Sequence, residues 1–222
     1  MFFYILCYKL YKYSYFRVQL RIDIKNGEIK MTINIQDCDI NNDYFHFTNK
    51  ANVNGILNEG LIPKIGVASN LVNDRANVSV SKGGKGIMGI INSFIYKFYQ
   101  EMKISDIPEE YRKYFNEISD FKLNDFISKE IACKAMIRKL KDEVYFRIMI
   151  SNEQLEKAKI GGLTGYDVNL PMKIDKANIE IITDSNNKVL SAYDVAKYIY
   201  EKAKNIDIFR KMHKDFFYMF EI

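Results

Sequence analysis

The chain has 222 residues, a formal net charge of +5 at pH 7 and a hydrophobic content of 48%. This length and composition are typical of one globular domain whose core is large enough to fold without disulfides or metals. Residues 1–30 carry +4 of the net charge and the remaining chain only +1. Residues 31–222 are so close to neutral that they lack the excess positive charge expected of a protein that binds duplex nucleic acid.

The cysteines and histidines of the chain argue against disulfides and bound metal. The three cysteines, Cys7, Cys38 and Cys133, are an odd number and lie far apart. They form no disulfide framework, so we predict a reducing, cytoplasmic location. The two histidines, His46 and His213, lack the H-x-x-x-H spacing of a zinc site, and we therefore predict no metal.

The first thirty residues are rich in tyrosine and do not form an unbroken apolar run. A secretory signal and a membrane span of about 20 apolar residues are therefore both excluded. Two interpretations stay open. Residues 1–30 are either a translated leader before a natural start at Met31, because Gly27-Glu28 can be encoded by a bacterial ribosome-binding sequence, or an extension whose residues 16–24 alternate as a strand. Residues 31–222 are then a single domain.

An aromatic, alternating stretch predicts a half-buried strand over residues 41–48. Its odd positions, Phe45 and Phe47, share one face and point towards a core, because successive side chains of a strand alternate. Its even positions share the other face, which we expect to meet solvent or a cleft: Tyr44, His46 and Thr48.

A short helix should follow this strand. Val53, Ile56 and Leu57 fall at helical spacing, and Thr48 or Asn49 can cap the first turn. Gly60 suits the left-handed position after the last turn. Leu61 is the expected partner of Ile56 in a Schellman ending.

A second strand is predicted over residues 77–81, with Ser79 and Ser81 on one face and two valines on the other. The glycine-rich residues 82–86 then predict a turn, followed by a buried helix over residues 87–100. Such a turn can present backbone N–H groups to an anion. It lacks the spacing of a P-loop, so a nucleoside triphosphatase is excluded.

The second half of the chain mixes helices and strands. We predict a helix over residues 123–140 and a final helix capped by Ser191, with Asp194 completing a capping box. Period-two patterns predict strands over residues 143–150, 164–170 and 178–183. The fold class is therefore α+β.

Three short motifs carry a resemblance to a known fold. His46-x-Thr48, Gly60-Leu61-Ile62-Pro63 and Ser79-Val80-Ser81-Lys82-Gly83 resemble the front half of an ADP-ribosyltransferase-like domain, and residues 172–182 resemble a late strand of it. The pattern is similar to that of RNA 2′-phosphotransferases and DNA-targeting ADP-ribosyltransferase toxins of bacteria. The resemblance implies split, mixed or antiparallel β-sheets around a central cleft with flanking helices, and NAD as co-substrate.

The resemblance also implies roles for individual residues. His46 would hydrogen-bond a ribose hydroxyl, Thr48 would help to hold the nucleotide, and Ser79 or Ser81 would line the nicotinamide ribose with Lys82 beside them. A carboxylate would stabilise the oxocarbenium-like state. Glu143 and Glu180 are the candidates for that carboxylate, and Arg75 and Arg147 are the candidates for additional arginines.

Structural readings of the same residues stay open. His46 also suits a hydrogen-bonded strand edge, Thr48 a helix cap, and the serines and glutamates a solvated strand face. Two functions follow. One is an NAD-dependent transferase of ADP-ribose, or a related 2′-phosphotransferase, acting on a protein or nucleic acid and not on a membrane. The other is a non-catalytic nucleotide-binding or interaction module that keeps the fold.

Overall fold

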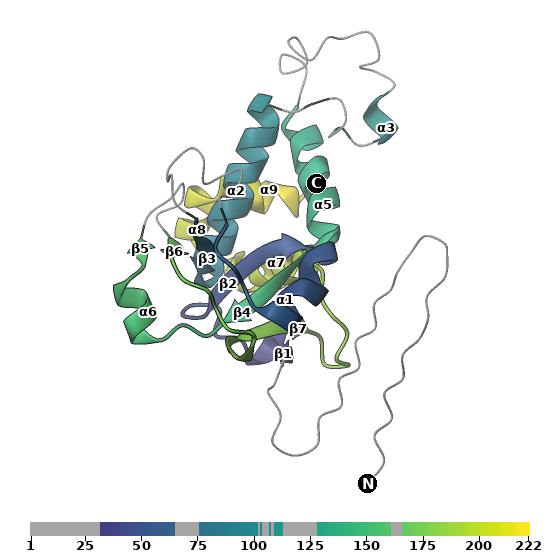
Figure 1. Ribbon diagram of the computed structural model, residues 1–222. Coiled ribbons are helices and arrows are strands. Elements are labelled where there is room, and N and C mark those ends of the chain that lie inside the picture. The colour runs from purple at the N-terminus through teal and green to yellow at the C-terminus, as the bar shows by residue number, and fades with distance from the viewer. Residues whose placement is uncertain are drawn as a thin grey trace, which may run out of the picture.

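A mixed β-sheet with helices on both faces organises the described part of the chain. The computed structural model describes residues 32–64, 76–101, 103, 107, 109–112, 128–160 and 166–222 (Figure 1). The strands of these residues form one seven-stranded sheet in the order β1-β7-β4-β2-β3-β6-β5. The α+β class predicted from the sequence is thereby confirmed.

The five strands predicted within residues 31–222 are present in the predicted order. β3 has the predicted length, shifted by one residue, the other four are shorter than predicted, and β1 and β5 were not predicted. Only β1 and β7 pair in parallel, and the other neighbours are antiparallel. The bounds are β1 Thr32–Asn34, β2 Tyr44–Asn49, β3 Val78–Lys82, β4 Glu143–Ile148, β5 Lys159–Ile160, β6 Asp167–Leu170 and β7 Ile179–Thr183. β7 is buried along its whole length, including its two polar residues Glu180 and Thr183.

The helices vary from one turn to five. Their bounds are α1 Val53–Glu59, α2 Gly83–Glu101, α3 Glu109–Arg112, α5 Lys129–Lys141, α6 Asn152–Glu156, α7 Ala192–Ala203, α8 Asp207–Met212 and α9 Lys214–Met219. Short 3₁₀ turns occupy Ile35–Asp37, Lys50–Asn52 and Lys176–Asn178. Within the described ranges, no helix has the length and apolar run needed to cross a bilayer.

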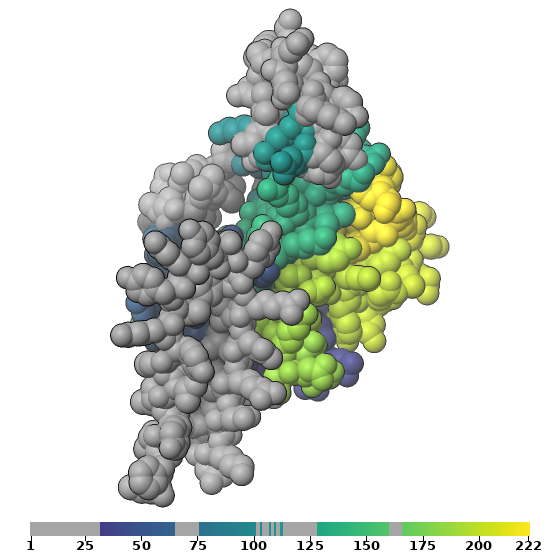
Figure 2. All heavy atoms as spheres, turned by 90° about the vertical axis from the view of Figure 1, so that its right-hand side faces the viewer, coloured from purple at the N-terminus to yellow at the C-terminus, as the bar shows by residue number. Residues whose placement is uncertain are grey.

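One face of the sheet, here called the helical face, carries Phe45 and packs against α2, α5, α7 and α9 (Figure 1). Figure 2 shows the teal-green surface of α5 adjoining the yellow surface of the C-terminal helices. The interior of this layer is almost wholly apolar, and its most buried side chains include Ile87, Ile91, Met136 and Phe216. This layer is the larger of the two hydrophobic clusters, so it anchors β2 and β4.

The opposite face, here called the α1 face, carries His46 and Phe146 as cross-strand partners. Val53, Ile56 and Leu57 of α1 belong there to the same apolar cluster as the valines of β3 and β6. β2, β4 and β7 therefore separate two cores by simple alternation. The side of the strand that we expected to be open is instead partly covered.

The pairing of β2 with β3 is short. These strands share only two residue pairs, Tyr44 with Lys82 and Phe45 with Ser81, whereas β2 and β4 share six. Both strands still belong to one seven-stranded sheet. We call the line beyond Phe45 and Ser81, where β2 and β3 are no longer paired, the seam.

The glycine-rich segment after β3 is helical rather than a turn. α2 begins at Gly83, whose φ of +63° and close approach to the carbonyl of Asn41 require glycine. The N–H groups of Gly83 and Gly84 donate to the carbonyls of Asp43 and Ile40, at 2.8 and 2.6 Å. These two donors are therefore satisfied by backbone and not presented to an anion.

The end of α1 also differs from the prediction. Gly60 has a positive φ of 85° as expected, and its N–H donates to the Ile56 carbonyl. Leu61 packs in the same cluster as Ile56, but its N–H donates to the carbonyl of Ile174 at 2.9 Å. A β-bridge thus replaces the Schellman hydrogen bond.

Other helix ends follow the local signals in the sequence. Ser191 caps α7, and Asp194 completes the predicted capping box. Ser128 caps α5, whose last turn carries three basic residues that complement the helix dipole. The predictions for residues 1–30, for Arg75 and for the start of a helix at residues 123–127 lie outside the described residues.

Candidate functional site

His46 lies at the seam, on β2 just past the last residue pair shared with β3. Its Nδ1 lies 2.9 Å from the carbonyl oxygen of Ser79. A carbonyl only accepts, so Nδ1 carries the proton. Burial lowers the pKa of His46, and the hydrogen bond to Ser79 opposes this less strongly. At neutral pH the imidazole is therefore uncharged, with Nε2 as a hydrogen-bond acceptor.

Two further side chains share the α1 face with His46. Tyr44 lies two residues earlier on β2 and is paired with Lys82 across the seam's closed end. The ammonium of Lys82 lies 5.9 Å from the centroid of the Tyr44 ring, within cation–π range. An exposed cation, an aromatic ring and a neutral acceptor therefore line one side of the seam.

Thr48 lies on the same face but is engaged locally. Its Oγ1 accepts a hydrogen bond from the side chain of Asn52 at 3.0 Å. The side chain of Asn49 accepts from the N–H of Ala51 and caps the turn that leads into α1. Asn49 thus caps the 3₁₀ turn Lys50–Asn52 and not α1 itself, whose N-cap residue Asn52 makes no side-chain cap hydrogen bond. Thr48 contacts the same turn through Asn52.

The serine hydroxyls lie on the opposite face of the sheet. Ser81 pairs with Phe45, is only 1% exposed and packs beneath Gly86 of α2. Ser79 is exposed, and its hydroxyl contacts the side chains of Asn77 and Asn169. We expected the imidazole and the hydroxyls to share one hollow. The register separates them. His46, at an even position of β2, shares its face of the sheet with the valines of β3, whereas the serines lie on the other face.

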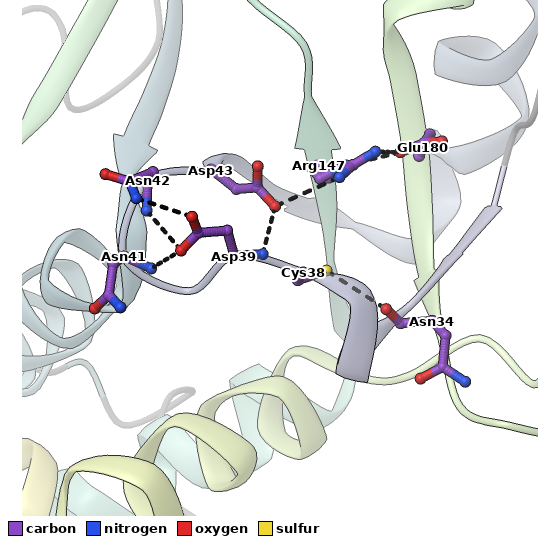
Figure 3. Close-up of polar contacts among 8 residues, drawn as sticks. All are labelled: Asn34, Cys38, Asp39, Asn41, Asn42, Asp43, Arg147 and Glu180. Atoms are coloured by element: carbon purple, nitrogen blue, oxygen red, sulfur yellow. Dashed lines mark hydrogen bonds and ion pairs between the residues drawn. The ribbon is translucent and has the colours of Figure 1, made fainter.

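Glu180 forms a buried ion pair on the helical face. It lies on β7 opposite Arg147 of β4 and is 3% exposed. Its Oε2 accepts from Nε of Arg147 at 2.7 Å and also from Nη2. Figure 3 shows the guanidinium between Glu180 and Asp43, whose Oδ2 lies 3.6 Å from Nη1. The carboxylate is therefore neutralised by a partner within the fold.

The loop before β2 holds Asp43 in place. Asp39 accepts hydrogen bonds from the backbone of Asn41 and from the backbone and side chain of Asn42, and its own N–H donates to Asp43 (Figure 3). The side chain of Asn42, then the backbone of Asn41, hold the pKa of Asp39 below its ordinary value. Burial, followed by the charge of Asp43, raises the pKa of Cys38 to about 12, so its thiol stays protonated.

Glu143 is likewise buried and paired. Its Oε1 lies 2.9 Å from Nζ of Lys139, one turn back along the chain in α5. It pairs with Asn49 across β2 and β4, which places it on the helical face beside Tyr145. Burial, and then the charge of Glu143, raise the pKa of Tyr145. Both predicted carboxylates therefore lie across the sheet from His46.

Some residues at the seam carried no individual prediction. Tyr44 was placed on the correct face by alternation, but only pairing with Lys82 makes it part of a site. Asn169 contacts Ser79 through the β3–β6 register, which no local pattern encodes, whereas Asn77 contacts it from two residues earlier in the chain. In the part of the chain that the structure describes, no three His, Cys, Asp or Glu side chains gather to hold a metal ion.

Comparison of the chain with models of protein families, with curated proteins and with solved structures finds no match.

Proposed function

We propose that this chain binds NAD or an NAD-like nucleotide at the seam. In this proposal it is an ADP-ribosyltransferase-like transferase of ADP-ribose, or a related 2′-phosphotransferase, and its acceptor is a protein or nucleic acid. The observation that carries the proposal is the neutral imidazole of His46, whose Nδ1 is engaged by Ser79. The acceptor Nε2 suits a ribose hydroxyl, which is a donor.

The neighbours of His46 match other parts of such a nucleotide. The exposed ammonium of Lys82 offers a charge-assisted hydrogen bond to a phosphate. Tyr44 offers an aromatic ring for a base or nicotinamide ring. The pairing of β2 with β3 ends after two residue pairs, and this supports the split-sheet arrangement that the motifs imply.

A transferase needs a carboxylate near the ribose that reacts, because the bond to nicotinamide breaks through an oxocarbenium-like state. Glu143 and Glu180 lie on the helical face and are paired with Lys139 and Arg147. This observation favours a second candidate function, a non-catalytic module that binds the nucleotide without cleaving it. Binding is common to both candidates, and turnover separates them.

Calorimetric titration with NAD tests the binding step. We expect His46→Ala to weaken binding about five- to tenfold, because one hydrogen bond to the ligand is lost. Lys82→Ala should weaken binding at low salt more than at high salt, because its contribution is ionic. Lys197→Ala, an exposed lysine of α7 on the far side of the helical layer, is the matched control and should bind as wild type. No heat of binding for the wild type would refute the proposal.

Release of nicotinamide from NAD, followed by chromatography, distinguishes the two candidates. Release that is lost in His46→Ala supports the transferase. Binding with no release supports the module. If release is observed, Glu180→Gln and Glu143→Gln should retain it, because these carboxylates face away from the seam.

A further inference from the structure

The carbonyl of Ser79 points towards His46 of β2, and this orientation determines how Ser79 meets β6 on the other side of β3. In a strand, the N–H and C=O of one residue point to the same edge. The Ser79 carbonyl points to His46, so its N–H also points towards β2. Lys82, three residues further along β3, has the opposite orientation, because its N–H donates to the carbonyl of Tyr166 just before β6.

Ser79 and Asn169 are therefore a non-hydrogen-bonded pair of the β3–β6 ladder. Their backbones exchange no hydrogen bond, and in such pairs the side chains approach closely. The direct polar link between the two residues is the contact of Ser79 Oγ with Asn169 Oδ1, at 2.6 Å. A second contact joins Ser79 Oγ to Asn77 Oδ1 at 3.0 Å.

The two amides and the hydroxyl can form a complete network. A hydroxyl carries one proton and can accept as well as donate. The Ser79 hydroxyl donates to the oxygen of one amide. It accepts from the NH₂ group of the other amide once that amide is flipped, so that its nitrogen and oxygen exchange places. Ser79 is thus held by side chains in the part of β3 that has no residue pairs with β2.

We infer that Asn169, assisted by Asn77, is a positioning residue for His46. It fixes Ser79 so that the Ser79 carbonyl holds the proton of the imidazole on Nδ1, and Nε2 is thereby presented as an acceptor at the seam. The inference deepens the proposed function, because it explains how the nitrogen that would meet the ribose is selected. The residue acts through Ser79 and does not touch the nucleotide.

The tautomer of His46 can be measured directly by two-bond ¹H–¹⁵N NMR correlation on the full chain labelled in histidine. The chain has two histidines, so His46→Asn assigns the spectrum. The wild type should show Nδ1–H at His46. In Asn169→Ala the ratio of this tautomer to the Nε2–H tautomer should fall at least about threefold, because a hydrogen bond that orders Ser79 is lost.

Three further variants make the result specific. Asn169→Asp keeps an acceptor for the Ser79 hydroxyl and should retain the wild-type tautomer. Asn205→Ala, an exposed asparagine after α7, is the matched control and should change nothing. His213 serves as an internal reporter of the fold in every spectrum, and Ser79→Ala replaces Asn169→Ala if that variant does not fold. Asn169→Ala and Ser79→Ala should both lower the ratio of the Nδ1–H tautomer to the Nε2–H tautomer of His46.

The inference is overturned if the wild type carries its proton on Nε2, or if neither Asn169→Ala nor Ser79→Ala changes the ratio. All of these spectra are recorded without NAD in the sample. A responsive tautomer without NAD binding would therefore refute only the proposed function, whereas NAD binding with an unresponsive tautomer would refute only the positioning role.

Discussion

At the scale of single residues, His46 shows how a fold selects one chemical form of a side chain. Burial disfavours the charged imidazole, and the Ser79 carbonyl accepts a hydrogen bond from Nδ1–H. The result is a neutral acceptor on a face that also holds Lys82 and Tyr44. The same environment that stabilises the strand therefore prepares the group for a hydroxyl donor.

The pH dependence of stability follows from the two histidines. Burial lowers the pKa of both His46 and His213 in the folded chain. The unfolded chain then binds more protons between the depressed folded pKa values and about 6.5, so stability rises with pH in that window. We predict that the free energy of unfolding falls as pH decreases from 7 to 5, by at most about 1.4 kcal/mol per pH unit for each histidine.

Urea denaturation at pH 7.5, 6.5 and 5.5 checks this prediction. The control is a double variant, His46→Gln with His213→Gln, which should lose most of the slope in that range. Carboxylates such as that of Asp39, whose pKa is lowered, contribute to a separate loss at more acidic pH. If the free energy of unfolding of the wild type increased as the pH was lowered from 7 to 5.5, the assignment of both histidines as neutral would be contradicted.

At the scale of elements, the end of α1 ties this helix to the strand region near Ile174. Gly60 has φ +85° and ψ −174°, a region that only glycine adopts readily. A Cβ added there would lie 2.3 Å from the Ile174 carbonyl oxygen. We predict that Gly60→Ala lowers the free energy of unfolding by on the order of 2–3 kcal/mol, measured by urea denaturation.

The same helix offers a matched control. Gly55 is exposed in the middle of α1, and nothing lies within 4 Å of the Cβ that alanine would add. Gly55→Ala should stabilise the chain by about 0.5–1 kcal/mol, because glycine is a poor helix former. Equal effects of the two substitutions would show that the end of α1 is not constrained as described.

Local signals in the sequence predicted these elements unevenly. The cap of α7 was predicted correctly because Ser191 and Asp194 interact three residues apart, within one turn. The start of α2 was not, because glycine has a low helix propensity and the positive φ of Gly83 at the start of the helix is fixed by tertiary contacts with the loop before β2. Local pattern identifies a contact only when both partners are close in the chain.

The candidate site shows the same limit. Alternation correctly placed His46 and Tyr44 on one face and Phe45 on the other. It could not give the register between β2 and β3, which puts the hydroxyls of Ser79 and Ser81 on the helical face. The ion pair of Glu180 with Arg147 joins β7 to β4 and depends on a register of the same kind.

At the scale of the whole molecule, the two cores and the seam have separate roles. The helical face buries most of the apolar side chains and encloses the ion pairs of Glu180 and Glu143. The α1 face is the smaller cluster and meets the seam at His46. Stability therefore resides mainly on one side of the sheet and the proposed binding site on the other.

The central claim is that a nucleotide binds at the seam with its ribose against His46. A crystal structure of the chain with NAD tests this most directly. We predict a ribose hydroxyl within hydrogen-bond distance of Nε2 of His46 and a phosphate near Nζ of Lys82, on the α1 face. A nucleotide seated on the helical face beside Glu180, or crystals grown at saturating NAD with no nucleotide at the seam, would contradict the account.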